Sequence, residues 1–524
     1  MEYTNFDKLT PRDVGQTFNG RGKVTVVKQT SGPTLMMIDD GTKVFTFKAF
    51  VKPGIRAFPE IDVGDMATVT AVLSKRMDNI EGEVKSMTKM SEEQAKSFEE
   101  EIEAANQAKY LPKCTEFSIK SEVLESLKPR FIQVATMIRQ AVMERRPIIL
   151  RHDADCDGYS SAMCMQRAII ALMDDVSGGD RLLPYQNFKR APSKAPFYEY
   201  EDAMKDMAYW LRDKVKNGAK APLVIITDNG STEEDILGYR QVKLYDCPIA
   251  VIDHHYPGEK DAEGKVAVDH LIQGHINPYL EGHDSNVCSG MLGYELARFI
   301  YENNSNEVMI PAMAGLLDHV DGPEKDAYIK LAEDAGYTQE YMTKLGTITY
   351  LQSHYLRFQE AREFVDDLFG NDKKVQNELV EMLYPEIEKR FAETCAIGKH
   401  YSKVTDMGKF HLVEFEGEKG TSRGQFPAVG LATNQIHAMF EKQLDKPVIT
   451  MTYGPTFLTI RVGDDIKGFS VPTFCTEWIQ KKIPHTGADG GGHEHAGSVK
   501  FVEYAKDEVL NLFKEYLTEI NSKQ

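Results

Sequence analysis

Cysteine is scarce and scattered in this 524-residue chain, and the pattern argues against two common classes of protein. No two of the seven cysteines form a C-x-x-C pair, so neither a zinc ribbon nor a framework of disulfide bonds is supported. Cys156 lies among aspartates, which disfavour a thiolate, so we expect it to be a small packing residue. The seven are Cys114, Cys156, Cys164, Cys247, Cys288, Cys395 and Cys475.

Long hydrophobic runs are also missing. No apolar stretch approaches the ~18 residues of a transmembrane helix. The first residues, MEYTNF, lack the basic and apolar regions of a secretory signal peptide. We therefore expect a cytoplasmic protein with no membrane partner.

Positive charge is not in excess, because the formal net charge is −18 at pH 7. This value argues against a protein that coats nucleic acid through bulk electrostatics. A local basic track remains compatible with it. The candidate positions are Lys28, Lys43, Lys48, Lys52 and Arg56 in one region, and Lys189, Arg190 and Lys194 in another.

The remaining composition is that of a globular protein, with 42% hydrophobic and 27% charged residues. A chain of this length exceeds one ordinary core, so we expect two to four domains. Residues 15–87 contain about five short strands, including two joined by an Asp-Gly turn in PTLMMIDDGTKVFTFKAF, which indicates a small barrel.

The barrel segment resembles the nucleic-acid-binding OB-fold at the front of some archaeal nucleases. The resemblance lies in QTSGPTLMMIDDGT, KAF and GIRAFPEIDVGD. A purely structural barrel is the alternative. The candidates for stacking on bases are Phe45, Phe47, Phe50 and Phe58, and we expect about half of them to be core residues instead.

From Pro147 onward, apolar strands alternate with helix-like stretches. PIILRH, PLVIIT and PIAVID are the strand candidates, and this alternation predicts βαβ units with a parallel sheet. Residues 326–399 are expected to be almost entirely helical. Strands return after GKFHLVEF, and the chain closes with a helix in KDEVLNLFKEYLTEI.

The first of these strands runs into DADCDG. Asp153, Asp155 and Asp157 alternate, so in an extended segment their carboxylates point the same way and repel one another unless cations lie between them. An EF-hand calcium loop is excluded, because the twelfth position counted from Asp153 is Cys164 rather than glutamate.

Later strands and apolar runs end in the same manner. PLVIIT leads to Asp228, PIAVID ends in Asp253 and is followed by His254 and His255, and AMAGLLDHVDG presents Asp318. The carboxyl ends of parallel strands line one crevice. An isolated aspartate after a strand is more often a helix cap than a ligand, but four such positions in order favour a common site.

Oxygen and imidazole ligands without thiolates suit Mn²⁺ or Mg²⁺ better than structural Zn²⁺. Five carboxylates exceed the need of one ion, so we expect two divalent ions about 3.5–4 Å apart, with Mn²⁺ favoured over Mg²⁺. Such a pair suits the hydrolysis of phosphoesters or phosphoanhydrides.

In order along the chain, DADCDG, ITDNGS, the triplet Asp253-His254-His255 and AGLLDHV resemble the four motifs of the DHH phosphoesterase superfamily. INPYLEGHDSNVCSGMLGYEL resembles the segment after the third motif in the RecJ branch. GADGGGHEHAGS and FLTIRV resemble the Gly-Gly-Gly-His motif and the arginine-bearing strand of the DHH-associated domain.

The resemblance implies a role for each matching residue. Asp253 would hold a histidine in orientation, His255 would contact the scissile phosphate, and whether Asp153 binds metal directly is left open. The metal ligands would be Asp155, Asp157, Asp228 as the bridge, His254 and Asp318. The substrate phosphate would be bound by Arg461, Gly490, Gly491, Gly492 and His493, for which a flexible glycine loop is the alternative.

The predicted fold class is α/β, with a parallel-sheet DHH domain, a smaller α/β DHH-associated domain, an OB-like barrel and helical connections. The expected domains are 1–90 (barrel), 91–146 (helical linker), 147–325 (DHH), 326–400 (helical linker or insertion) and 401–524 (DHH-associated).

The implied function is a RecJ-like exonuclease that hydrolyses single-stranded DNA or RNA to 5′-mononucleotides, with replication or repair proteins as further partners. Two alternatives stay open. One is a phosphodiesterase for oligoribonucleotides, cyclic dinucleotides or pAp, and the other is a scaffold at the replication fork.

Overall fold

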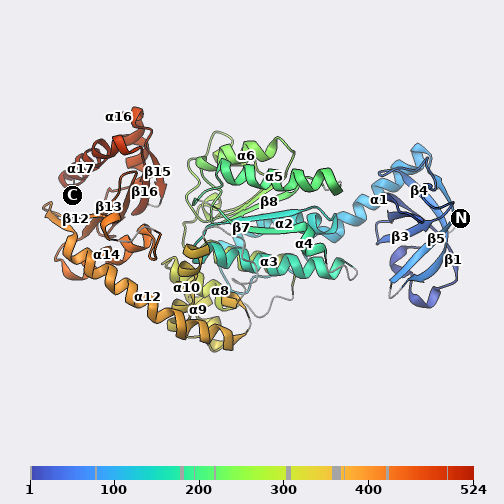
Figure 1. Cartoon of the computed structure of the whole chain (residues 1–524), viewed down its shortest axis with the longest axis horizontal. Coiled ribbons are helices and arrows are strands. Elements are labelled where there is room, and N and C mark those ends of the chain that lie inside the picture. Colours follow the sequence, from blue (N-terminus) through green and yellow to red (C-terminus); the bar gives the residue numbers. More distant parts are fainter. Residues whose placement is uncertain are drawn as a thin grey trace. The chain divides into compact units, whose positions relative to one another are not determined.

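The computed structural model describes residues 3–76, 79–177, 182–193, 195–217, 220–302, 308–356, 367–370, 372–420, 424–492 and 494–523. The chain divides into two compact units, Met1–Pro112 and Lys113–Gln524 (Figure 1). None of the described helices is both long enough and apolar enough to span a membrane.

The first unit is a closed five-stranded barrel, as the turn pattern predicted, with the strand order β1-β2-β3-β5-β4. Alternate residues of each strand fill the barrel interior. The helix α1 (Glu92–Tyr110) follows the last strand. The strands are β1 (Thr17–Gln29), β2 (Thr34–Asp39), β3 (Val44–Ala49), β4 (Met66–Arg76) and β5 (Asn79–Lys89).

Two of the four proposed stacking residues are core residues. Phe45 is 3% exposed and Phe47 is fully buried, with their ring centroids 5.3 Å apart. They sit two positions apart on β3, so both point to the same, inner face. Phe50 follows the strand and is 63% exposed, and Phe58 is partly buried. Phe45 and Phe47 are therefore the core half of the four candidates, and Phe50 and Phe58 remain candidates for stacking.

The second unit begins with a parallel sheet of order β10-β9-β8-β6-β7, which confirms the predicted sheet. Side chains of β6, β8 and β9 are buried on both faces, as expected for a sheet covered by helices on each side. The strands are β6 (Ile148–His152), β7 (Phe188–Pro192), β8 (Leu223–Thr227), β9 (Ile249–Ile252) and β10 (Gly274–Ile276).

Helices cover both faces of this sheet. The larger core joins one face to α2 (Glu122–Met143), α3 (Cys156–Val176) and α7 (Ser289–Ile300). The other face packs on α5 (Tyr200–Asn217) and α6 (Ile236–Lys243), and the short α4 (Leu183–Asn187) precedes β7.

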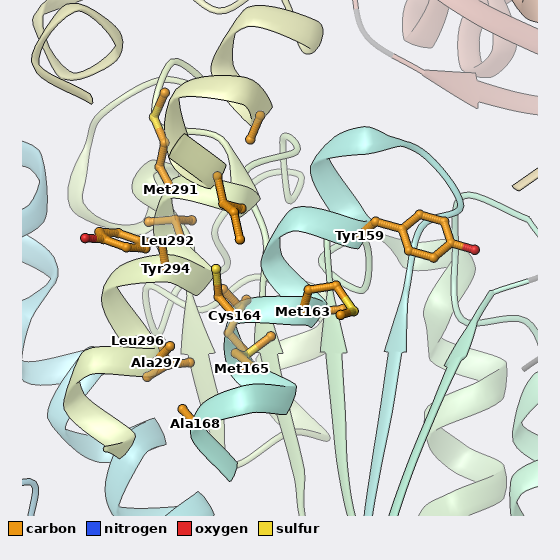
Figure 2. Packing of buried hydrophobic residues seen from close by; sticks show 14 of the residues in the cluster. Tyr159, Met163, Cys164, Met165, Ala168, Met291, Leu292, Tyr294, Leu296 and Ala297 are labelled. Carbon is orange, nitrogen blue, oxygen red and sulfur yellow. The ribbon is translucent and has the colours of Figure 1, made fainter. Parts of the chain in front are cut away.

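Close packing of α3 against α7 fixes the start of α3, which carries the first acidic motif. Figure 2 shows Cys164, Met165 and Ala168 of α3 on the side that faces Leu296 and Ala297 of α7. Tyr159 points away from α7, and its ring centroid lies 4.6 Å from that of His152. Cys156 is buried, and burial followed by the charges of Asp155 and Asp157 raises the pKa of its thiol well above the usual value, which fits a packing role.

The segment after the sheet is helical, as predicted for its described residues. It contains α8 (Met309–Leu317), α9 (Pro323–Asp334), α10 (Gln339–Leu356) and α12 (Lys373–Tyr401). The first three pack into the same core as α3 and α7.

The last part of the second unit is a six-stranded mixed sheet of order β11-β12-β13-β14-β16-β15. An aromatic cluster with Phe474, Phe513 and Tyr516 fills its core. The strands are β11 (Lys403–Asp406), β12 (His411–Glu416), β13 (Val448–Tyr453), β14 (Phe457–Val462), β15 (Asp489–Gly492) and β16 (Ala496–Lys500). The helices are α13 (Gly417–Gly420), α14 (Val429–Gln443), α15 (Val471–Thr473), α16 (Gln480–Lys482) and α17 (Lys506–Lys523).

Candidate metal centre

Three neighbouring strands deliver acidic residues to one edge of the parallel sheet. Asp153 follows β6, Asp228 follows β8 and Asp253 follows β9, and these strands lie side by side with parallel pairing. The carboxyl ends of parallel strands meet at one edge, so the three side chains start from one crevice.

The six predicted metal ligands gather at this edge, together with His255. Within each of three groups, the candidate ligand atoms lie within 4.8 Å of one another. Asp228 and His254 each belong to two groups, so the groups form one continuous cluster. The groups are Asp153, Asp155 and Asp228; Asp228, His254 and His255; and Asp157, His254 and Asp318.

Asp228 belongs to two of the three groups, and its backbone conformation is strained. Its φ is 59°, in the left-handed region, and its backbone N–H donates to the Ile252 carbonyl at 2.9 Å. The side chain is 2% exposed, and its Oδ1 has no hydrogen-bond partner among the described residues. Burial, and then the charges of Asp157 and Asp155, raise the pKa of this carboxyl well above its usual value.

Asp153, Asp155 and Asp318 are destabilised as anions in the same way. Burial, and then the neighbouring Asp155, raise the pKa of Asp153 to about 7. Burial raises the pKa of Asp318 to about 7 although the nearby His254 lowers it, and burial together with Asp157 raises the pKa of Asp155. The cluster therefore favours the binding of cations, whose positive charge can take the place of the protons that these carboxyls otherwise hold.

Asp318 comes from a helix rather than from a strand. It caps the C-terminus of α8, and its N–H donates to the Ala314 carbonyl at 2.9 Å. The C-terminal end of a helix carries partial negative charge, which adds to the cost of a carboxylate there.

Asp157 differs from the other acids, because the protein itself already stabilises its charge. Its Oδ2 accepts a hydrogen bond from the Ser289 N–H and its Oδ1 accepts one from the Gly290 N–H, both at 2.8 Å. These donors open α7, where the helix dipole favours an anion. A bidentate bond to the first turn of α7 thus fixes Asp157 in the cluster.

The histidines of the triplet are held in different ways. His254 Nδ1 lies 2.9 Å from the Ser285 carbonyl, so Nδ1 is the donor and Nε2 presents its lone pair. Nε2 lies 3.5 Å from Asp228 Oδ1 and 3.7 Å from Asp318 Oδ2. This orientation suits a metal ligand.

Asp253 forms hydrogen bonds with the His255 side chain and with the neighbouring backbone. Its Oδ1 lies 2.7 Å from His255 Nδ1 and accepts the N–H groups of both histidines. Burial opposes the imidazolium, but the charge and hydrogen bond of Asp253 raise the pKa of His255 to about 10. Burial also raises the pKa of Asp253, yet His255 outweighs it and holds the pKa of that carboxyl well below its usual range. His255 is accordingly a cationic donor.

A buried hydrogen-bond network supports the triplet and was not predicted from the sequence. His275 joins Asp269 (Nδ1 to Oδ1, 2.7 Å) to the Ser231 hydroxyl (Nε2 to Oγ, 3.0 Å). Asn277 donates to that hydroxyl at 3.0 Å and to the His255 carbonyl at 2.9 Å. Asn277 directly follows β10, so the rule that located the acids at strand ends would also have found it.

In the second predicted basic cluster, Arg190 is not part of a surface track. Arg190 is buried and bonds to His152 Nε2 and Gln166 Oε1, each at 2.9 Å. Lys194 lies outside the described residues. In the barrel, Lys48 pairs with Glu81 at 2.6 Å, so the carboxylate of Glu81 offsets the positive charge that Lys48 could offer to a nucleic acid.

The glycine run forms an edge strand, not a loop. A Cβ built on Gly490 would lie 2.4 Å from the Ser498 carbonyl oxygen, and one on Gly492 (φ 140°) would lie 2.3 Å from that of Ala496. Close pairing of β15 with β16 therefore requires glycine at both positions. His493 lies outside the described residues.

Arg461 lies on β14 in the same sheet. Its Nε donates to Asn434 Oδ1, and its Nη1 donates to the Ile460 carbonyl at 2.7 Å. Burial lowers the pKa of the guanidinium to about 10, so it remains a cation at neutral pH.

The glycine strand also meets the part of the unit that carries the acids. Lys500 of β16 pairs with Glu199 at 3.7 Å. A Cβ on Gly491 would lie 3.5 Å from Glu234 Oε1, six residues beyond Asp228. The metal cluster and the far sheet therefore belong to parts of the second unit that are in contact.

Comparisons with known proteins show which sequences and structures this chain resembles. No protein-family profile matches the chain. A Methanocaldococcus jannaschii protein named "Uncharacterized protein MJ1198" is 36% identical over 542 residues, which cover 97% of this chain and 70% of that protein.

Solved structures are similar as well. One described as "Member of s1p family of ribosomal proteins PF0399 DHH domain" is 33% identical, with a TM-score of 0.77, and the match covers 82% of this chain and 99% of that one. RecJ in complex with Mn²⁺ from Thermus thermophilus is 14% identical, with a TM-score of 0.49, and the match covers 77% of this chain and 56% of that one.

Proposed function

The chain belongs to the DHH superfamily, and on that basis we propose that it is a metal-dependent exonuclease that releases 5′-mononucleotides from single-stranded DNA or RNA. One observation carries the proposal. Five aspartates and two histidines, drawn from separate elements, converge at one edge of a parallel sheet. Such a cluster suits the hydrolysis of a phosphodiester.

The cluster fits divalent metal ions on its own chemistry. It offers only carboxylate oxygens and imidazole nitrogens, which suit Mn²⁺ and Mg²⁺. Asp228 presents a buried Oδ1 that has no hydrogen-bond partner among the described residues. Residues that would hold two ions are Asp153, Asp155, Asp157, Asp228, His254 and Asp318, with Asp228 shared.

Bound divalent ions supply a nucleophile at neutral pH and neutralise charge on the phosphate. The residues of the chain bind and orient the substrate. His255, kept cationic by Asp253, donates a hydrogen bond to a phosphate oxygen. Arg461 and the backbone of β15 hold the substrate strand from the far sheet.

The barrel is the proposed grip on a longer strand. Its exposed Phe50 and its partly buried Phe58 are the remaining candidates for stacking on a base. A dinucleotide needs no additional binding domain, so the presence of the barrel favours a polymer over a small substrate.

The test is product analysis with end-labelled single strands. A DNA 20-mer and its RNA equivalent are incubated with Mn²⁺, with Mg²⁺ or with a chelator, and the products are separated over time. We expect 5′-mononucleotides from at least one polymer, with Mn²⁺ the better metal and no product with the chelator. Cleavage of dinucleotides but never of a 20-mer would establish the small-substrate phosphodiesterase instead.

A further inference from the structure

His275 forms a hydrogen-bonded bridge beside the start of the triplet. It lies on β10, which pairs with β9 at the end of the parallel sheet. Its Nε2 lies 3.0 Å from the hydroxyl of Ser231, in the loop that follows β8. Because β9 lies between β8 and β10, the contact joins the two elements on either side of the strand that leads to Asp253.

The outer end of this bridge is held by a carboxylate. His275 Nδ1 lies 2.7 Å from Oδ1 of Asp269, in the short helical turn Ala267–His270. A carboxylate only accepts, so Nδ1 carries the hydrogen, and in a neutral ring Nε2 then accepts the hydrogen of the Ser231 hydroxyl. Asp269 thus fixes the orientation of the His275 ring, which is buried.

Asn277 joins the bridge to the triplet itself. Its Nδ2 donates one hydrogen to Ser231 Oγ at 3.0 Å and the other to the His255 carbonyl at 2.9 Å. Its Oδ1 accepts the Tyr279 N–H at 3.0 Å. A carbonyl acceptor on one side and an N–H donor on the other leave the amide one orientation. Ser231 and Asn277 are fully buried, so solvent does not compete for these bonds.

The serine held in this way contacts Asp253. The Ser231 N–H donates to Asp253 Oδ2 at 3.2 Å, while Oδ1 of the same carboxylate lies 2.7 Å from His255 Nδ1. Asp253 is fully buried, whereas the His255 side chain is 26% exposed. A continuous chain of hydrogen bonds therefore runs from Asp269 to the histidine of the triplet that reaches the surface.

We propose that His275 is a positioning residue of the active site. Paired with Asp269, it fixes Ser231 in the loop after β8. Ser231 in turn holds Asp253, and with it the ring of His255, in the orientation that suits a contact with the substrate phosphate.

This inference rests on the proposed function and deepens it. Neither His275 nor Ser231 belongs to a group of candidate metal ligands in the described part of the chain. Loss of the bridge should therefore weaken the hold on a phosphate and leave the hold on metal intact.

The test compares His275→Leu with His411→Leu. His411 is the matched control, because it is also a buried histidine that pairs with an aspartate, Asp445, at 2.9 Å, but it lies on β12 in the far sheet. The measurements are kcat and KM on a dinucleotide, the affinity for a nucleoside 5′-monophosphate with Mn²⁺ present, the affinity for Mn²⁺ alone, and the temperature of thermal unfolding.

For His275→Leu we expect kcat/KM and monophosphate affinity to fall about tenfold each, as for a misaligned hydrogen bond to a charged group. Mn²⁺ affinity should be unchanged. Both leucine variants should unfold at a lower temperature, because each loses a buried polar pair, but His411→Leu should keep the wild-type monophosphate affinity. This difference separates positioning from a general loss of stability.

Two further variants make the test independent of one substitution. His275→Gln keeps a side-chain acceptor for the Ser231 hydroxyl and should recover most of the lost monophosphate affinity. Ser231→Ala removes the hydroxyl with little change in volume and should lose phosphate affinity without losing Mn²⁺ affinity. The losses from Ser231→Ala and His275→Leu should not add in the double variant, because both break the same chain of bonds.

Wild-type kcat/KM and monophosphate affinity in a folded His275→Leu or Ser231→Ala variant would overturn the inference and leave the proposed function intact. A parallel fall in Mn²⁺ affinity would also overturn it, because the bridge would then hold metal ligands instead of His255. A wild-type chain that neither cleaves a phosphodiester nor binds the monophosphate would overturn the proposed function first, and this inference with it.

Discussion

At the scale of the residue, Asp228 has a strained backbone and a buried carboxyl that is unfavourable as an anion, and a bound cation would stabilise that anion. It combines a left-handed backbone, a buried side chain and a neighbourhood of other aspartates. Strained conformations and crowded like charges persist only where the surrounding structure imposes them. Asp228 is therefore expected to favour metal binding at the expense of the stability of the metal-free protein.

The substitution Asp228→Asn tests whether this residue favours metal binding at the expense of the stability of the metal-free protein. In the metal-free protein it should raise the free energy of unfolding by about 1 kcal/mol, because it removes a buried acid from among like charges. The stabilisation of the wild type by Mn²⁺ should be lost, and hydrolysis should fall at least about 100-fold. Thermal unfolding with Mn²⁺ and with a chelator measures both effects, and a variant that Mn²⁺ stabilises as much as the wild type would argue against a bridging role.

The acids also make the stability of the metal-free protein depend on pH. Asp153 and Asp318 have pKa values of about 7 in the folded state, against 3.8 ordinarily. Between about pH 4 and pH 7 the folded chain holds protons that the unfolded chain has lost, so their contribution to the free energy of unfolding falls as pH rises through this window.

The measurement compares denaturant unfolding of the wild type with that of an Asp153→Asn, Asp318→Asn double variant, both metal-free. The wild type should lose stability relative to the variant from pH 4 to pH 7, and saturating Mn²⁺ should reverse the loss. A difference that is constant over this range would mean that the two carboxyls are not destabilised by burial.

At the scale of the element, the first turn of α7 distinguishes Asp157 from its neighbour Asp155. Asp157→Ala leaves two N–H groups of α7 without their acceptor, so the free energy of unfolding should fall by about 2 kcal/mol even without metal. Asp155→Ala removes a crowded acid, although it also removes the Asp155 Oδ1 acceptor of the Gly158 N–H at 2.9 Å, and should cost less. Chemical unfolding of both metal-free variants decides the order, and an equal loss would show that the bond to α7 adds nothing.

Apolar runs that end in polar residues brought most of these residues to attention in the sequence, because the carboxyl ends of neighbouring parallel strands meet at one edge of the sheet. β6, β8 and β9 follow that rule. Alternation within β3 also placed Phe45 and Phe47 on one face, yet it could not by itself say that this face was the interior. The exposed Phe50 follows the strand, where alternation no longer applies.

Contacts between distant segments could not be predicted. Asp157 meets an N–H group 132 residues further along the chain, and Ser231 meets His275 44 residues away. Such residues acquire their surroundings from the packing of separate elements, on which local spacing carries no information.

At the scale of the whole molecule, the division at Pro112 separates the barrel from the hydrolytic machinery. A chain without residues 1–112 should bind a single-stranded 20-mer at least about tenfold more weakly, because the barrel no longer contacts the strand. Hydrolysis of a dinucleotide should be unchanged. Fluorescence anisotropy and dinucleotide turnover provide the two readouts. If both substrates were lost equally by a folded truncated chain, the barrel would not be a grip on the strand.

The central claim is that the acids and histidines form a site for two divalent ions, and calorimetric titration of the metal-free chain with Mn²⁺ tests it most directly. We expect two ions to bind each wild-type chain and at most one to bind Asp228→Asn, because Asp228 belongs to two of the three ligand groups. A wild-type chain that binds no Mn²⁺, or an Asp228→Asn variant that binds two ions with wild-type affinity, would contradict the account.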